Sequence, residues 1–540
     1  MRRVHECARG RMTDRIIRPR ADMDRRTMRI PALAVLLAAA FVPAATSHAG
    51  EASPRRQAVP RQDLRAQVDE AVRSSGLAGA SVAVSVVDIA TGNVLLAQRG
   101  DEQLIPASNM KVLTTGAALH VLGPSFEFRT RMVRSGDCLT VVGDGDPSFG
   151  DPAFLAELIH VDAAGAKRKG LSAEQLVDLW AQAARRAGVT AAREVVVDDR
   201  VFDREFVHPS WPADQLDNSY CAQVAGLNFH ENVLLATVGA DGGRPAVLKW
   251  DPPAPWLRAA PAANATVNAQ GKKAPDFGFR RDEADPGRFV LWGNLRLAKG
   301  APPPAFPICV RDMPAFFARF VAARLAAAGI AVGAARTASA ADPPAGDGAL
   351  GPAVRMSIAK VIERCNEESQ NMYAESLLKR MGAARTGKPG SWASGCEAVA
   401  AAIAERLGPQ ARAAYVGSDG SGLSRGNRVT ANLLARWIAS LAADPALGAP
   451  FVASLAQAGH EGTVQKRFDA EALRAMGAEI HCKTGYINGV SCLSGCAGPA
   501  GATPRYAFSV LCNDLGKVKD GIRKAKDLQE RVAMALAKGG

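Results

Sequence analysis

The stretch PASNMKVLTTGAAL, Pro106 to Leu119, decides the fold prediction because it places a serine and a lysine three residues apart where an apolar helix begins. At this spacing Ser108 and Lys111 lie on one face of a helix. A lysine removed from water loses its proton more readily, so it can act as the base for a serine nucleophile. Pro106 places Ser108 near the helix N-terminus, where free N–H groups and the helix dipole favour an oxyanion.

The same spacing occurs twice more, in Ser357 with Lys360 and in Ser376 with Lys379. Serine is a favoured helix cap and lysine is common on surfaces, so most such matches carry no chemistry. One continuous helix is predicted across AVRMSIAKVIERCNEESQNMYAESLLKRMG. On such a helix Ser357 would lie roughly 18 Å from Ser369, too far to share a site with it.

Two later motifs separate Ser108 from the other serines. The chain continues with Ser369-Gln370-Asn371 and then with Lys483-Thr484-Gly485. The order SxxK, SxN, KTG is that of penicillin-binding proteins and class A β-lactamases. Ser376 follows the SxN element and therefore breaks this order, so Ser108 is the predicted nucleophile.

Each residue of the later motifs has a physical task in such a site. Ser369 can relay a proton toward a leaving amine, and the amide of Asn371 can hold the catalytic lysine and the substrate backbone. Lys483 and Thr484, on a predicted edge strand, can present a charge and a hydroxyl to a substrate carboxylate. Gly485 has no side chain and lets the ligand approach closely.

The arrangement of strands and helices predicts one domain that is split by an insertion. A helix and a hairpin precede the opening stretch, and the end of the chain reads as strands closed by a helix. Between them, Gly- and Pro-rich loops separate short strand-like runs, which predicts a largely loop and strand insertion. The expected boundaries are 50–130 and 351–540 for the two parts of the split domain and 131–350 for the inserted domains.

The first 49 residues have the pattern of a secretory signal peptide, with an Arg-rich start, a short apolar run and a small-x-small ending. The apolar run is too short to span a bilayer and none of comparable length follows, so we expect an exported, periplasmic protein without stable membrane insertion. Nine cysteines follow this leader. In an oxidising compartment some of them are expected to pair.

Composition excludes several classes of protein. Hydrophobic residues make up 48% and charged residues 22%, as in ordinary soluble proteins. The formal charge of +13 falls when the basic leader is removed, and no basic patch with interleaved aromatics appears, so no nucleic-acid partner is expected. Cys492 and Cys496 lack a second ligand pair and no HExxH occurs, which predicts no metal.

Several collinear segments extend the three motifs, among them VVGDGDPSF, DGSGLSRGNRVT and AGHEGTVQKRF. With these segments the chain resembles, from about residue 63 to about residue 530, the D-alanyl-D-alanine carboxypeptidase/endopeptidase family, the low-molecular-mass class C penicillin-binding proteins. The resemblance implies an α+β fold: a transpeptidase-like (serine β-lactamase-like) domain with an antiparallel sheet flanked by helices, interrupted by two smaller β-rich inserted domains.

The resemblance also implies a reaction on peptidoglycan stem peptides. Ser108 would attack the carbonyl of the penultimate D-alanine, with the backbone N–H groups of Ser108 and Tyr486 as oxyanion hole. Water would then hydrolyse the acyl-enzyme. The terminal carboxylate would lie against Lys483 and Thr484, beside Ser369. Such enzymes need no cofactor and are acylated by β-lactams.

Three further implications concern the walls of the cleft. Leu423, in DGSGLSRGN, resembles a residue beside the family's site. The segment WPADQLDNSYCAQ resembles a stretch that in some relatives receives a diaminopimelate-type side chain, which points to Trp211, Asp214 and Tyr220, although the spacing to Tyr220 is one residue longer. The family has Ser or Thr after KTG, whereas this chain has Tyr486.

Two alternatives to a D-Ala-D-Ala carboxypeptidase or endopeptidase stay open from the residues. One is a β-lactamase or esterase on the same scaffold, which would differ in fast deacylation. The other is a catalytically silent peptidoglycan-binding protein, favoured if Tyr486 blocks the site. A homodimer is likewise an open alternative to a monomer.

Overall fold

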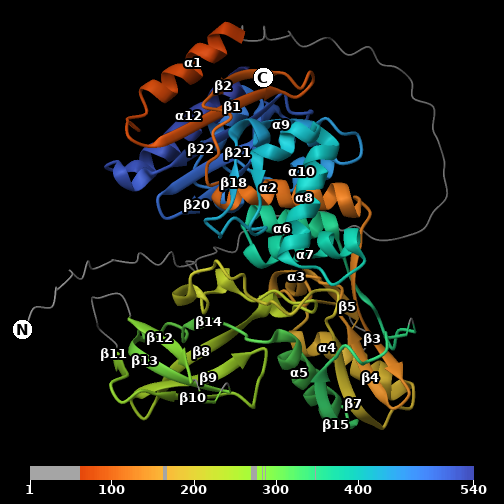
Figure 1. Ribbon diagram of the computed structural model, residues 1–540. Coiled ribbons are helices and arrows are strands. Elements are labelled where there is room, and N and C mark those ends of the chain that lie inside the picture. The colour runs from red at the N-terminus through yellow and green to blue at the C-terminus, as the bar shows by residue number, and fades with distance from the viewer. Residues whose placement is uncertain are drawn as a thin grey trace, which may run out of the picture. The chain divides into compact units, whose positions relative to one another are not determined.

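The computed structural model describes residues 61–161, 167–268, 276–282, 284–285, 287–346 and 348–539. The predicted signal peptide therefore lies outside the described residues. A six-stranded sheet joins both ends of this part of the chain, with β1 next to β22, and all of its pairings are antiparallel (Figure 1). Its strands, in sheet order, are β19 (Ala456–Gln457), β20 (Ala478–Ile487), β21 (Val490–Pro499), β22 (Tyr506–Asn513), β1 (Ser81–Asp88) and β2 (Val94–Gln98).

Both faces of this sheet are buried, because helices cover each of them. Alternate residues of a strand point to opposite faces and therefore enter different cores. In β22, Phe508 and Val510 pack into one core with α1 and α12, whereas Ala507 and Leu511 pack into a second core with the central helices. The helices on the first face are α1 (Arg61–Arg73), α11 (Ala470–Met476) and α12 (Gly521–Gly539). Those of the second core are α2 (Met110–Leu122), α6 (Ile358–Glu367), α7 (Asn371–Thr386), α8 (Trp392–Leu407), α9 (Ala431–Ala442) and α10 (Gly448–Ala453).

Helix α2, which follows the predicted nucleophile, is the centre of the second core. Every residue from Met110 to Leu119 is buried, including Lys111. A helix that is apolar all round has no solvent face and must be covered by neighbours. Here α6, α7, α8 and α9 all contact it, so the amino end of α2 is held in a fixed place beside β20.

The segment between α2 and α6 contains two larger groups of strands and a small antiparallel pair, β5 (Ile159–Val161) with β6 (Lys167–Lys169). The first group is a five-stranded sheet. Its strands are β15 (Ala331–Thr337), β7 (Ala191–Asp198), β4 (Cys138–Val142), β3 (Glu127–Ser135) and β16 (Val354–Ser357). In this sheet β3 follows α2 along the chain, and its neighbour β16 precedes α6. The second group consists of β14 (Ala305–Cys309), β8 (Val233–Asp241), β9 (Arg244–Asp251), β10 (Arg258–Pro261), β11 (Thr266–Asn268), β12 (Phe277–Arg281) and β13 (Arg288–Arg296).

Two long helices in this segment correct the expectation of loops and strands alone. Helices α4 (Ala173–Arg186) and α5 (Met313–Ala327) share a core with β4 and β7, through side chains such as Trp180 and Phe317. A capping box at Ser172 begins α4, and Asp312 caps α5. In α4 the apolar residues do recur at the helical period, so the signal was available, whereas α5 is apolar on most of its sides and shows little periodicity.

The predicted continuous helix over the SxN motif is also wrong. Helix α6 ends at Glu367 and α7 begins at Asn371, because Ser369 has a left-handed backbone with φ +61°. A left-handed non-glycine residue cannot continue a right-handed helix. The break therefore makes the turn that carries the motif.

Two other expectations concern the cysteines and the membrane. The expected pairing of cysteines is not found, since all nine beyond the leader are free thiols and most are buried. Within the described ranges, no helix combines the length and the apolar character that a membrane span requires.

Candidate active site

Ser108 and Lys111 meet at the start of α2. Ser108 lies in a short 3-10 turn, η1 (Ala107–Asn109), directly before the helix. Lys111 Nζ lies 3.1 Å from Ser108 Oγ. It also donates to Asn371 Oδ1 at 2.6 Å and to the carbonyl oxygen of Ser421 at 2.9 Å. The lysine nitrogen therefore lies within hydrogen-bond reach of the predicted nucleophile and is held by two oxygen acceptors.

Burial changes the acidity of Lys111. Its side chain is fully buried, and the loss of water lowers its pKa to about 8, although the carboxylates of Glu375 and Asp419 act in the opposite direction. Desolvation disfavours the charged form of a lysine. About a tenth of Lys111 is therefore neutral at pH 7, and about half at pH 8, and this form has a lone pair that can take the proton of Ser108.

The turn between α6 and α7 brings the SxN motif to the same place. Asn371, the first residue of α7, accepts from Lys111 and donates through Nδ2 to the backbone oxygen of Tyr220 at 2.8 Å. Ser369 Oγ accepts from Lys483 Nζ at 2.9 Å. The three motifs are thus joined by hydrogen bonds between their own side chains, over more than 370 residues of sequence.

Strand β20 carries the KTG motif past the nucleophile turn. Asn109 Nδ2 donates to the backbone oxygen of Lys483 at 3.0 Å. At Gly485 a Cβ would lie 2.7 Å from the carbonyl oxygen of Pro106 and 3.1 Å from the backbone nitrogen of Asn109. No side chain fits in that space, so glycine allows β20 to lie against η1. The backbone of Tyr486 follows directly, beside the turn that holds Ser108.

Lys483 is the second buried lysine of the site. Besides Ser369, it donates to the backbone oxygen of Thr484 at 3.0 Å. Burial, assisted by the nearby charge of Lys111, lowers its pKa to about 7. An anionic ligand beside Lys483 would favour the charged form and raise this pKa.

Two buried carboxylates fix the loop whose Ser421 carbonyl oxygen accepts from Lys111. Glu375, on α7, accepts from the backbone nitrogens of Gly420 and Ser421, each at 2.8 Å. Asp419 accepts from the backbone nitrogens of Gly422 and Ser424. The loop is therefore held from both sides, and the carbonyl of Ser421 points at the lysine.

From the sequence, no role was assigned to Glu375 and Asp419, the two carboxylates that support this loop, nor to Thr463, which contacts the KTG motif. The available signals were a glutamate between the apolar residues of MYAESLL, at Glu375, and an aspartate at the start of DGSGLSRGN. Leu423, which was predicted, is half-buried in this loop and packs against the core of the central helices.

Tyr486 leaves the rim of the site open. Its side chain is 56% exposed, so the phenol is directed to solvent and does not fill the space beside Lys483. A second hydroxyl beside the KTG motif comes from Thr463, in η6 (Gly462–Val464), which accepts from Thr484 Oγ1 at 2.8 Å. Gly462 has φ +55°, and a Cβ there would lie 2.4 Å from the backbone oxygen of Glu367. This close approach fixes the position of Thr463.

The two other serine–lysine pairs have structural positions. Ser357 caps α6 and accepts from the backbone nitrogen of Lys360, while Lys360 pairs with Glu363 at 2.8 Å. Ser376 and Lys379 are buried in α7, and Lys379 Nζ donates to Asp203 at 2.7 Å. Neither pair contacts the SxN or KTG residues through a hydrogen bond.

The three predicted residues of the inserted segment lie in different environments. Trp211 is only 5% exposed, and its indole N–H donates to Asp419 Oδ2 at 3.0 Å, so it supports the 419–424 loop through a buried hydrogen bond. This differs from the predicted place of Trp211 in a side-chain pocket, because a buried indole offers no surface to a ligand. Asp214 and Tyr220 are exposed, and the backbone oxygen of Tyr220 accepts from the motif residue Asn371.

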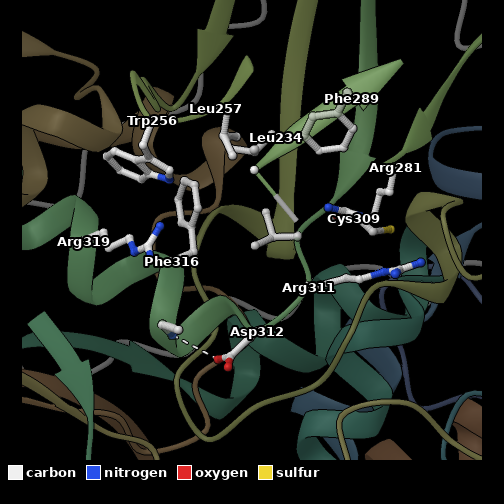
Figure 2. A pocket seen from close by; sticks show the side chains of 13 residues that line it. Leu234, Trp256, Leu257, Arg281, Phe289, Cys309, Arg311, Asp312, Phe316 and Arg319 are labelled. Carbon is white, nitrogen blue, oxygen red and sulfur yellow. Dashed lines mark hydrogen bonds between the residues drawn. The ribbon is translucent and has the colours of Figure 1, made fainter. Parts of the chain in front are cut away.

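A separate pocket of about 220 Å³ lies in the inserted segment (Figure 2). Its wall includes Trp256, Phe289 and Phe316, and arginines such as Arg281 and Arg319 also line it. None of the predicted site residues lines this pocket. Within the described residues, no cluster of three or more His, Cys, Asp or Glu side chains is placed to hold a metal ion.

Comparison with known proteins identifies the family. A model of the D-Ala-D-Ala carboxypeptidase 3 (S13) family matches residues 64–534. The chain belongs to this family. The prediction made from the SxxK, SxN and KTG order is thereby confirmed, and membership of S13 makes the chain a serine hydrolase of the peptidase type.

Two curated relatives agree with the S13 assignment. The D-alanyl-D-alanine carboxypeptidase of Actinomadura sp. (strain R39) is 30% identical over 484 residues, covering 84% of this chain and 81% of the relative. A carboxypeptidase of Mycobacterium tuberculosis (strain ATCC 25618 / H37Rv) is 26% identical over 418 residues, covering 76% of this chain and 71% of the relative.

The fold is also that of a solved penicillin-binding protein. The crystal structure of penicillin binding protein 4 from Haemophilus influenzae superimposes with a TM-score of 0.64 at 19% identity, covering 85% of this chain and 97% of that chain. This likeness confirms the predicted fold class, with an antiparallel sheet flanked by helices and interrupted by inserted strands.

Proposed function

We propose that the protein is a serine D-Ala-D-Ala carboxypeptidase that also cleaves D-Ala cross-links in peptidoglycan, through an acyl-enzyme on Ser108. The observation that carries this proposal is the position of Lys111 Nζ, fully buried and 3.1 Å from Ser108 Oγ. The family match and the carboxypeptidase relatives favour this activity over a β-lactamase, an esterase or a silent binding protein.

In the first step, neutral Lys111 takes the proton of Ser108 as the serine oxygen attacks the carbonyl of the penultimate D-alanine. The backbone N–H groups of Ser108 and Tyr486 stabilise the oxyanion that develops. The proton that Lys111 took from Ser108 passes through the hydroxyl of Ser369 to the amine of the departing D-alanine, which returns Lys111 to its neutral form; Ser369 Oγ also accepts from Lys483 Nζ at 2.9 Å. Water then hydrolyses the acyl-enzyme, and Lys111 serves again as base.

The terminal carboxylate of the substrate would lie beside Lys483, Thr484 and Thr463. The hydroxyls of the two threonines are 2.8 Å apart, so both can donate to one carboxylate. The second hydroxyl that the family has after KTG is absent here, because Tyr486 occupies that position. We infer that Thr463 supplies it from a neighbouring loop, and that the exposed Tyr486 contributes its backbone N–H and a rim surface.

The place of action follows from the substrate. Peptidoglycan lies outside the cytoplasm, which agrees with the predicted signal peptide at 1–49 and with export to the periplasm. β-Lactams, which resemble the D-Ala-D-Ala terminus, would acylate Ser108. The exposed Asp214 and Tyr220 border Asn371 through the Tyr220 backbone, and we propose this segment as the surface that meets the side chain of the stem peptide.

Mass spectrometry of stem pentapeptides treated with the mature protein tests the proposal. The expected product is a peptide shorter by one D-alanine, from the wild type but not from Ser108→Ala. Cross-linked dimers should be cut at the D-alanyl bond. Intact pentapeptide after prolonged incubation with the wild type would contradict the proposal, and a rapidly lost penicilloyl adduct would favour a β-lactamase instead.

A further inference from the structure

Three consecutive residues of the inserted segment have a left-handed backbone. His230, Glu231 and Asn232, in η4, have φ values of 54°, 56° and 56°. L-residues rarely adopt this conformation, and it persists only where the surroundings enforce it. Here the backbone nitrogen of His230 donates to Phe149 O at 3.0 Å, and Asn232 Oδ1 accepts from the backbone nitrogen of Phe229 at 2.9 Å.

This strained stretch directs the carboxylate of Glu231 to the turn between α6 and α7. Glu231 Oε1 accepts from Gln370 Nε2 at 3.0 Å and from Arg364 Nη2 at 2.8 Å. Gln370 is the middle residue of the SxN motif, between Ser369 and Asn371. A carboxylate from the inserted segment therefore contacts the turn that carries two of the proposed catalytic groups.

Among the described residues, Glu231 is the hydrogen-bond partner that holds the side chain of Gln370. Gln370 precedes the first residue of α7, yet its side chain makes no hydrogen bond to that helix end. Ser369, one residue earlier, has a left-handed backbone, and its hydroxyl must meet Lys483. Asn371, one residue later, must meet Lys111. Gln370 lies between these two residues, so a shift of its backbone would displace both groups.

The surroundings allow Glu231 to change its charge near neutral pH. Burial, with the repulsion of Asp151 and Glu368, raises the pKa of Glu231 to about 7, although Arg364 favours the ionised form. Tyr373, on α7, also faces this cluster and hydrogen-bonds to Asp151. The carboxylate form accepts strongly from Arg364 and Gln370, whereas the protonated form is a weaker acceptor.

We propose that Glu231 is a positioning residue for the SxN turn: its ionised carboxylate fixes Gln370, and thereby aligns Ser369 and Asn371 for catalysis. The inference rests on the proposed peptidase function and adds that the inserted segment controls the alignment of the active site. Loss of the negative charge on Glu231, by protonation or by substitution, lowers the turnover of D-Ala-D-Ala peptides without removing any group that touches the substrate.

The test compares kcat/KM of the wild type and Glu231→Gln for release of D-alanine from a D-Ala-D-Ala peptide between pH 5.5 and 8.5. Glutamine mimics the protonated acid, and both enzymes share the ionisations of the two active-site lysines, which cancel in the ratio. The expected ratio of wild type to variant is near one at pH 5.5 and rises, through a midpoint near pH 7, to about tenfold, because misaligned groups lose part of their orientation advantage. A ratio that does not change with pH overturns the inference.

A matched control is Glu368→Gln. Glu368 also contacts Arg364, but it is half exposed and makes no hydrogen bond to Gln370. Its ratio should be near one at pH 8.5, where Glu231 is ionised in both proteins, and should fall slightly below one between pH 6 and 7, because loss of the repulsion from Glu368 lowers the pKa of Glu231. A double-mutant cycle with Gln370→Leu adds a second readout: the effect of Glu231→Gln should disappear in that background, and its persistence would contradict the proposal. If Glu231→Gln does not fold, Gln370→Leu tests the same contact from the other side and should show the same pH-dependent ratio.

Failure of this inference differs from failure of the proposed function. A wild type that releases no D-alanine at any pH contradicts the proposed function. A fully active wild type with a pH-independent ratio contradicts only the role of Glu231. Labelling of Ser108 by penicillin in each variant confirms that the compared proteins are folded.

Discussion

Replacing Lys111 with arginine would keep a positive charge beside Ser108 and remove the base. The pKa of Lys111 is lowered to about 8, so about half of the lysine is neutral at pH 8. An arginine has a pKa above 12 and would be neutral in about one molecule in 10⁴ or fewer at that pH. The available base thus falls by about 10⁴. Because other groups or water give some residual proton transfer, the expected loss of acylation rate lies between about 10² and 10⁴.

The assay is the second-order rate of labelling by a fluorescent penicillin at pH 8. Lys360→Arg is a matched control, because Lys360 has the same spacing from a serine but pairs with Glu363 at the surface. It should leave the rate unchanged. A Lys111→Arg protein that is labelled within tenfold of the wild-type rate would refute the reasoning, since no neutral base would then be needed at that position.

Three further results are expected. The pH profile of kcat/KM should be bell-shaped, with its maximum near pH 7.5. The rate rises as Lys111, with a pKa of about 8, loses its proton, and it falls as Lys483, with a pKa of about 7, loses its own. A profile that is flat from pH 6 to 9 would exclude these roles. Thr463→Val should lower kcat/KM for peptides with a free terminal carboxylate by about tenfold, and Thr463→Ser should stay near wild type. Steady-state kinetics on carboxylate- and amide-terminated peptides measures this effect. An equal loss on both peptides would show that Thr463 does not contact the carboxylate. Trp211→Phe should lower the free energy of unfolding by about 1–3 kcal/mol, because buried Asp419 loses a donor; an unchanged urea midpoint would contradict that support.

The sequence predicted the parts of the site that lie in short motifs. Ser108, Lys111, Ser369, Asn371 and Lys483 were found because fixed spacings and their order along the chain mark them, and the structure brings all five together. The split domain was predicted because strand-like runs occur at both ends of the chain, with a hairpin before the opening stretch. The burial of both faces of the sheet was not foreseen from the alternation of the first two strands.

The supporting contacts could not be predicted because they depend on residues far apart in sequence. Glu375 and Asp419 both act on one loop, and Thr463 reaches the KTG motif from a separate turn. No local pattern marks such a pairing. The break at Ser369 was missed for a different reason: helix-forming residues lie on both sides of it, and a single left-handed residue leaves no compositional signal.

The identity of the nucleophile is the central claim, and peptide mapping by mass spectrometry after incubation with penicillin tests it most directly. If Ser108 is the nucleophile, one penicilloyl adduct per chain is expected, on the peptide that contains Ser108, and none on Ser108→Ala. An adduct on Ser357 or Ser376, or equal labelling of the wild type and Ser108→Ala, would contradict it.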